Sequence, residues 1–181
     1  MANMLNFLKE NANTIVKMMV YQFGLTIFGF MLSMSVGQNE FLQLIASIFA
    51  IIFYLFLLYS MTWTVGSKDH EKVANKRAPY VPIKGIYMSL FANAVNFVIG
   101  ILYFFAYIIE GESGGLYSII MPITKLIQAM YLGLSINILE DFHFVMYLFT
   151  PVPSVLICGL AYYLGVKEIS ILKLLGINTK K

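Results

Sequence analysis

Four long stretches without a charged side chain constrain the fold of this chain more than any other feature. Residues 18–39, 41–67, 85–109 and 142–166 contain no Asp, Glu, Lys or Arg. A helix needs about 20 apolar residues to cross a hydrocarbon core about 30 Å thick, and each stretch meets that length. A further apolar segment, residues 116–139, contains one charge, Lys125. The sequence therefore predicts an integral membrane protein.

The overall composition agrees with this prediction. Hydrophobic residues make up 60% of the 181 residues and charged residues 12%, and the mean hydropathy is +0.80. Soluble domains are about half apolar and about a quarter charged. A soluble protein this apolar would expose large hydrophobic patches. We therefore expect one all-α, polytopic domain over residues 1–181, surrounded by the lipid bilayer.

The chain divides into apolar segments and polar connections. The first apolar stretch is too long for a removable signal peptide, and no small-x-small pattern follows it, so we expect it to remain as an anchor. Residues 110–115 form an acidic turn, and residues 166–181 are expected to form an interfacial C-terminal helix. Four to five transmembrane helices are predicted, from the segments at 13–34, 41–63, 85–109, 116–139 and 142–165, with a polar loop at 66–84.

Charge placement predicts the orientation in the membrane. Lysine and arginine gather in the loop 66–84, and Lys9 and Lys17 flank the first segment. Cytoplasmic loops carry an excess of Lys and Arg, so the N-terminus and this loop are expected to be cytoplasmic. The localisation expected is a plasma membrane or bacterial inner membrane, since the usage of Lys, Ile, Asn and Phe resembles that of AT-rich bacterial genomes.

Two topologies remain open for the second half of the chain. If segment 116–139 crosses the bilayer, the lysine-bearing tail lies outside, against the charge rule. If this segment is re-entrant, the tail lies inside with the other basic residues. Pro122 supplies a break that would support a re-entrant path, whereas the length of the segment is sufficient to cross.

Lys125 is the residue that most suggests a site. Placing a lysine at the centre of a membrane helix costs roughly 2.5–3.5 kcal/mol on insertion scales. On a continuous helix from Leu116, Lys125 lies about 13 Å along the axis, close to mid-depth. No other embedded segment contains a carboxylate to pair with it. It is interpreted either as a lysine that binds a small anionic ligand or partner, or as one that reaches an interface because its segment is tilted or re-entrant.

Polar and small residues recur at spacings of three and four along several segments, which places them on one helical face. Such seams are typical of close helix packing in membranes. Helix packing alone explains Asn93 and Asn96 less well, because two amides one turn apart cost several kcal/mol if they are buried without hydrogen-bond partners. With Lys125, Gln128 and Gln22 they predict a polar ligand site at mid-depth, where transporter sites often lie. Packing alone remains the alternative.

No catalytic, cofactor or metal site is predicted. The sequence has no HExxH, GxSxG or P-loop motif, which are the patterns that would suggest hydrolase or nucleotide chemistry. The single cysteine, Cys158, excludes an intrachain disulfide and a CxxC site. The charged cluster Glu140, Asp141 and His143 is expected to be a solvated turn. The small positive charge is typical of membrane topology, so no nucleic-acid partner is expected.

These observations favour a small membrane transport protein, or a transmembrane subunit of a transporter, with a polar site around Lys125. The alternative is a non-catalytic scaffold or interaction protein whose polar seams pack its own helices or a partner subunit. In that case Lys125 would pair with a carboxylate of the partner. An intramembrane enzyme is not supported, because no nucleophile and base converge in the sequence.

Overall fold

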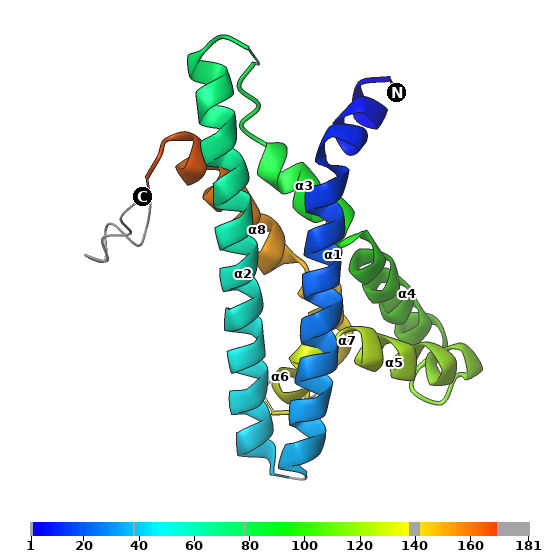
Figure 1. Cartoon of the computed structure of the whole chain (residues 1–181). Helices are drawn as coiled ribbons and strands as arrows, with labels where there is room; N and C mark the ends of the chain where they lie inside the picture. Colours follow the sequence, from blue (N-terminus) through cyan, green and yellow to red (C-terminus); the bar gives the residue numbers. More distant parts are fainter. Residues whose placement is uncertain (1, 38, 78, 138–141, 170–181) are drawn as a thin grey trace.

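The computed structural model of the chain describes residues 2–37, 39–77, 79–137 and 142–169 (Figure 1). The described residues form helices and no strand. In chain order the elements are α1 (Ala2–Val36), α2 (Glu40–Ala74), α3 (Lys84–Ala92), α4 (Ala94–Glu110), α5 (Gly115–Ile127), the 3₁₀ turn η1 (Ala129–Tyr131), α6 (Leu132–Asn137), α7 (His143–Phe149) and α8 (Val152–Val166).

Three helices of the described chain are long and apolar enough to cross a membrane by themselves, and the number rises to five if each of two bent pairs counts as one span. The three are Met4–Val36, Glu40–Ala74 and His143–Val166. The all-helical class and the multi-pass character predicted from the sequence are confirmed at this level.

The first two helices form an antiparallel pair joined by a tight turn (Figure 1). Gly37 has a φ of 65°, which favours glycine, and the side chain of Asn39 caps α2 by accepting a hydrogen bond from the backbone N–H of Leu42 at 3.1 Å. α2 then continues to Ala74, so the first half of the expected loop 66–84 is helical. No Pro or Gly interrupts residues 67–74, and the connection to α3 is confined to residues 75–83.

Two of the expected segments are broken. Segment 85–109 consists of α3 and α4, which meet at Asn93 with a bend of 60°. Segment 116–139 consists of α5, η1 and α6 with a bend of 85° after Gln128, and its last two residues lie outside the described chain. Pro122 was the expected cause of a break, but it lies inside α5 and the bend comes two turns later. The interfacial helix expected at 166–181 falls mostly outside the described residues.

Glycine lets α8 pack closely against α2 and α3. A Cβ atom added to Gly66 would lie 2.4 Å from the carbonyl oxygen of Tyr162, and one added to Gly85 would lie 2.3 Å from that of Cys158. Only glycine fits such contacts, in the way that small residues allow membrane helices to approach. Gly165 of α8 makes the reciprocal contact with the Trp63 carbonyl and Gly66, so small residues on both helices allow this packing.

The end of α8 lies beside the end of α2 (Figure 1). The indole N–H of Trp63 donates to the carbonyl oxygen of Ile169 at 2.8 Å, and Nδ1 of His70 lies 2.7 Å from the carbonyl oxygen of Val166. At the opposite end, Gly133 of α6 packs against the carbonyl of Gln43, in the first turn of α2. These contacts hold α8 and α6 against opposite ends of α2.

Candidate functional site

The two helix breaks meet in a buried polar cluster. Asn93 ends α3 and precedes α4, and Gln128 ends α5; each side chain is only 1% exposed. A break in a helix leaves backbone groups without their intrahelical partners. Polar side chains placed at the break can bond such groups, which is why amides are suited to these positions.

Asn93 is the centre of the first half of the cluster. Its Nδ2 donates to the carbonyl oxygen of Ser89 at 3.0 Å, one turn earlier in α3. Its Oδ1 accepts from Nδ2 of Asn96 at 3.3 Å and from the hydroxyl of Tyr54 at 3.5 Å. The cluster therefore joins the α3–α4 break to the middle of α2.

Gln128 forms the second half. Its Nε2 donates to the carbonyl oxygen of Asn96 at 3.3 Å, and its Oε1 accepts a hydrogen bond from the hydroxyl of Thr150. The hydroxyl of Tyr131 donates to the carbonyl oxygen of Thr150 at 3.0 Å. Thr150 lies at the junction of α7 and α8, so three interruptions of helical structure converge on one set of amides and hydroxyls.

One hydrogen-bond acceptor of this cluster has no donor among the described residues. The side chain of Asn96 is 4% exposed, and its Oδ1 has no hydrogen-bond partner among the described residues. An unbonded polar atom in an apolar environment costs about 1–3 kcal/mol on protein scales. A water molecule or a ligand that donates to Asn96 Oδ1 would remove that cost.

Asn96 also lines an open groove between α1 on one side and the α3–α4 break and α5 on the other. The groove has a volume of about 470 Å³. Its walls are apolar and include exposed residues such as Phe23 and Leu126. Its polar members besides Asn96 are Gln22, which is 8% exposed, and Thr26, whose hydroxyl donates to the carbonyl oxygen of Ile127 at 3.1 Å. The amide of Gln22 has no hydrogen-bond partner among the described residues.

Four of the five site residues predicted from the sequence therefore come together. Asn93, Asn96 and Gln128 share one hydrogen-bonded cluster, and Gln22 faces the adjoining groove with Asn96. Lys125 is half-buried in the last turn of α5, where it lines neither the groove nor the cluster. Within the described chain it forms no hydrogen bond or ion pair. Its expected role in ligand binding stays a prediction.

A second polar centre lies on α2, where a charged loop was expected. Asp69 is 8% exposed and its carboxylate pairs with Lys84 at 2.6 Å and with Lys72 at 3.3 Å. The hydroxyl of Tyr162 donates to the same carboxylate at 3.0 Å. The signal for this centre is present in the sequence, since the buried series Leu58, Thr62, Gly66 and Asp69 continues one helical face beyond the apolar stretch.

His143 was expected in a solvated turn, but the structure places it away from full exposure. His143 is half-buried in a group of aromatic rings, and its Nε2 lies 3.3 Å from the hydroxyl of Tyr117. Tyr117 in turn bonds the hydroxyl of Tyr103 at 3.3 Å. Glu140 and Asp141 of the expected charged turn lie outside the described residues.

No group of three or more His, Cys, Asp or Glu side chains within the described part of the chain is arranged to hold a metal ion. Cys158 is buried in the apolar core, and its backbone carbonyl lies against Gly85 of α3. Comparisons of the chain with protein-family models, with curated proteins and with solved structures find no match.

Proposed function

We propose that this chain is a small membrane transport protein, or the transmembrane subunit of a transporter, whose substrate site is the groove lined by Gln22 and Asn96. The observation that carries the proposal is the unpartnered Oδ1 of Asn96 beside an open groove at two helix breaks. Transporters often place substrates at discontinuous helices near the bilayer midplane. Such breaks also let a segment move without unwinding a whole helix.

The groove selects a substrate class by its chemistry. Its volume of about 470 Å³ falls in the range of roughly 300–1,000 Å³ typical of small-molecule sites. Its walls are apolar, and Asn96 Oδ1 can only accept a hydrogen bond. The expected substrate is therefore an amphipathic molecule that enters from the lipid phase and presents an N–H or O–H group to Asn96 and Gln22. The anionic ligand expected earlier depended on Lys125, which does not line this groove.

The proposal includes a topology. We infer that α5, η1 and α6 form a re-entrant segment, and that α1, α2, α3–α4 and α7–α8 cross the bilayer. In support, α6 lies against the first turn of α2, and α8 ends beside Trp63 and His70 near the other end of α2. The N-terminus, residues 75–83 and the end of α8 then share one side. The positive-inside rule makes that side cytoplasmic.

The test is native mass spectrometry of the full chain, extracted in mild detergent, with identification of small molecules that remain bound. We expect an amphipathic molecule that is not a bulk lipid on the wild type. Its affinity should fall about tenfold in Asn96→Leu and in Gln22→Met, the equivalent of roughly 1.4 kcal/mol. Val98→Leu, on the exposed face of α4, is the control and should keep the molecule. Equal occupancy in all variants would contradict the groove as the site.

A second candidate function rests on Lys125. A half-buried ammonium on an apolar helix, without an ion pair in the described chain, fits a subunit interface at which a partner's carboxylate completes the pair. This chain would then be a scaffold or interaction protein. Purification from its own cells distinguishes the two proposals. A stoichiometric protein partner that is lost in Lys125→Met supports the interface, whereas a chain that is monodisperse alone and binds a small molecule supports transport.

A further inference from the structure

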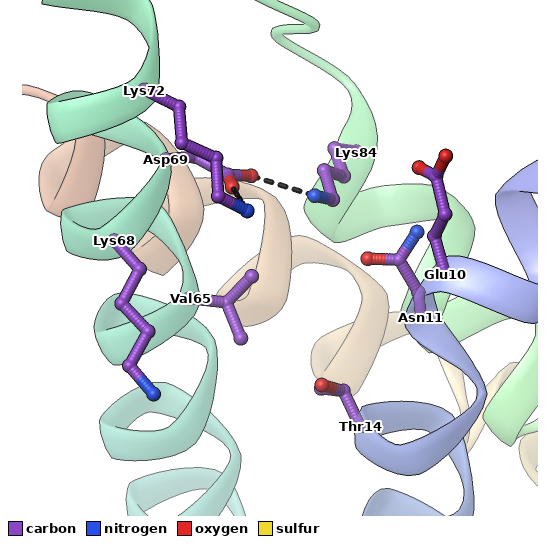
Figure 2. Close-up of a pocket in the computed structure, with 8 residues that line it drawn as sticks. All are labelled: Glu10, Asn11, Thr14, Val65, Lys68, Asp69, Lys72 and Lys84. Atoms are coloured by element: carbon purple, nitrogen blue, oxygen red, sulfur yellow. Dashed lines mark hydrogen bonds and ion pairs between the residues drawn. The ribbon is translucent and has the colours of Figure 1, made fainter. Parts of the chain in front are cut away.

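A pocket separate from the groove lies at the end of the bundle where α1, α2 and α3 meet (Figure 2). Its volume is about 390 Å³, within the range of ligand sites. Unlike the groove, it is lined almost entirely by polar side chains. They are Glu10, Asn11 and Thr14 from α1, Lys68, Asp69 and Lys72 from α2, and Lys84 from α3, with Val65 as the apolar member.

Asp69 holds two of the lysines in place. Lys72 pairs with Oδ1 of Asp69 at 3.3 Å and Lys84 with Oδ2 at 2.6 Å, so the two ammonium groups flank one buried carboxylate (Figure 2). Tyr162 bonds Oδ2 as well, at 3.0 Å. An ammonium has three N–H donors. Each lysine uses one on Asp69 and retains others for a ligand.

The wall formed by α2 and α3 has an excess of positive charge. This wall carries three lysines, Lys68, Lys72 and Lys84, and one carboxylate, that of Asp69. Lys72 and Lys84 meet at Asp69, Lys68 points away from them along α2, and Glu10 is on the opposite helix (Figure 2). Thr14 adds a hydroxyl without a partner among the described residues. On the α1 side, Asn11 Nδ2 donates to the carbonyl oxygen of Phe7 at 2.8 Å. That bond leaves Oδ1 of Asn11 as an acceptor beside Glu10.

The pocket lies at the depth of lipid headgroups. The charge-free run of α2 ends at Ser67, and Trp63 marks the kind of position that tryptophan takes at a membrane interface. Asp69 is six residues beyond Trp63, about 9 Å along the helix axis. A phosphate group of a lipid would sit at this level, and a soluble phosphate compound could reach the pocket from water.

We infer that this pocket binds a phosphate ester group, with the phosphate oxygens on the ammonium groups of Lys72 and Lys84, while Lys68 adds positive charge to the pocket from lower on α2. Lysine binds phosphate as a charged donor, and Asp69 holds both of these ammonium groups in place. Glu10 and Asn11 Oδ1 on the opposite wall would accept from a hydroxyl or ammonium carried by the same headgroup. This inference does not depend on the groove between α1 and α4, because the two sites share no residue.

The experiment is a titration of the purified full chain, followed by native mass spectrometry, with three probes. They are short-chain phosphatidylglycerol, inorganic phosphate, and the corresponding diacylglycerol, which lacks phosphate. We expect phosphatidylglycerol to bind in a one-to-one complex and diacylglycerol not to bind. Competition by inorganic phosphate at millimolar concentration would identify a soluble phosphate compound as a ligand. Failure to compete would identify the lipid headgroup, and either result supports the pocket.

Two double variants distinguish binding in the pocket from non-specific attraction between the lipid phosphate and the positive charges of the protein. The double variant Lys68→Gln, Lys72→Gln changes two exposed residues of the pocket and should weaken phosphatidylglycerol binding about tenfold. The control Lys9→Gln, Lys76→Gln removes the same charge from exposed positions outside the pocket and should change binding less than about twofold. Three results would overturn the inference. They are equal losses of binding in the two double variants, binding of diacylglycerol as tight as that of phosphatidylglycerol, and no binding of either phosphate probe.

Discussion

The carboxylate of Asp69 lies 2.6 Å from the ammonium of Lys84 and joins α2 to the first residue of α3. The pair bridges residues 75–83, the connection between the two helices. Tyr162 of α8 donates to the same carboxylate. One buried acid therefore fixes three helices at the end of the bundle where the lysine pocket lies.

Asp69→Asn should destabilise the protein. The change leaves Lys84, whose side chain is 17% exposed, without a counter-charge in a partly buried site. Removing one partner of a buried pair costs more than the pair contributes, and we expect a loss of about 1–3 kcal/mol here. Thermal unfolding in detergent measures it. Glu71→Gln removes the same charge from an exposed position of α2 and should have little effect. Equal shifts for the two variants would contradict a structural role for Asp69.

Gly165→Leu should disrupt the packing of α8 on α2. A Cβ atom at Gly165 would lie 2.3 Å from the carbonyl oxygen of Trp63 and 3.1 Å from Cα of Gly66, so the two backbones would have to separate. Size-exclusion chromatography should show aggregated or poorly folded protein. Gly24→Ala is the matched control, because its Cβ meets nothing within 4 Å. Alanine favours helix by about 1 kcal/mol over glycine, so this variant should be neutral or more stable. Normal folding of Gly165→Leu would show that the close approach is unnecessary.

The proposed topology predicts which residues a membrane-impermeant maleimide can reach. Single cysteines replace Glu112, Arg77 and Lys167, all exposed, in a Cys158→Ala background. Glu112→Cys should be labelled in intact cells. Arg77→Cys and Lys167→Cys should react only after the membrane is opened, because both are expected on the cytoplasmic side. If Arg77→Cys and Lys167→Cys are labelled from opposite sides, the segment of α5 and α6 crosses the bilayer.

The sequence was sufficient to predict the helical membrane class and the burial of three polar residues. Asn93, Asn96 and Gln128 are buried as their spacing suggested, because a period near 3.6 survives local bending. The breaks were harder to predict. Asn93 is neither proline nor glycine, and the bend after Gln128 depends on partners from distant segments, such as Thr150 and Asn96. Tertiary hydrogen bonds of this kind leave no local pattern.

The depth estimated for Lys125 shows why the rest of the site could not be derived. That estimate used the rise along a straight helix perpendicular to the membrane. Lys125 lies before the 85° bend, but α5 itself runs across the long helices α1 and α2 instead of along them (Figure 1), so distance along its axis does not measure depth. Asp69 was missed for a related reason, because its charged neighbours concealed the continuation of the buried face of α2. Composition identifies the spanning segments, whereas the path of a broken segment is set by packing.

Lys125→Met should increase the stability of the isolated chain. Lys125 is half-buried on α5 and has no ion pair in the described chain. An unpaired ammonium in a membrane helix is unfavourable by roughly 2.5–3.5 kcal/mol at full depth. Its stem can lower this penalty by carrying the charge toward water. We therefore expect a gain of about 1–2 kcal/mol in the free energy of unfolding.

The matched control is Ile123→Met, an apolar exchange at an exposed position of the same helix, which should leave stability nearly unchanged. Chemical unfolding in detergent measures both variants, and native mass spectrometry of each, purified from its own cells, measures any bound protein. A stability gain with loss of a protein partner would assign Lys125 to a subunit interface. A gain without such a loss would leave the groove of Gln22 and Asn96 as the functional site. If Lys125→Met lowers stability while Ile123→Met does not, the ammonium is already stabilised within the isolated chain, and the proposal of an incomplete pair is wrong.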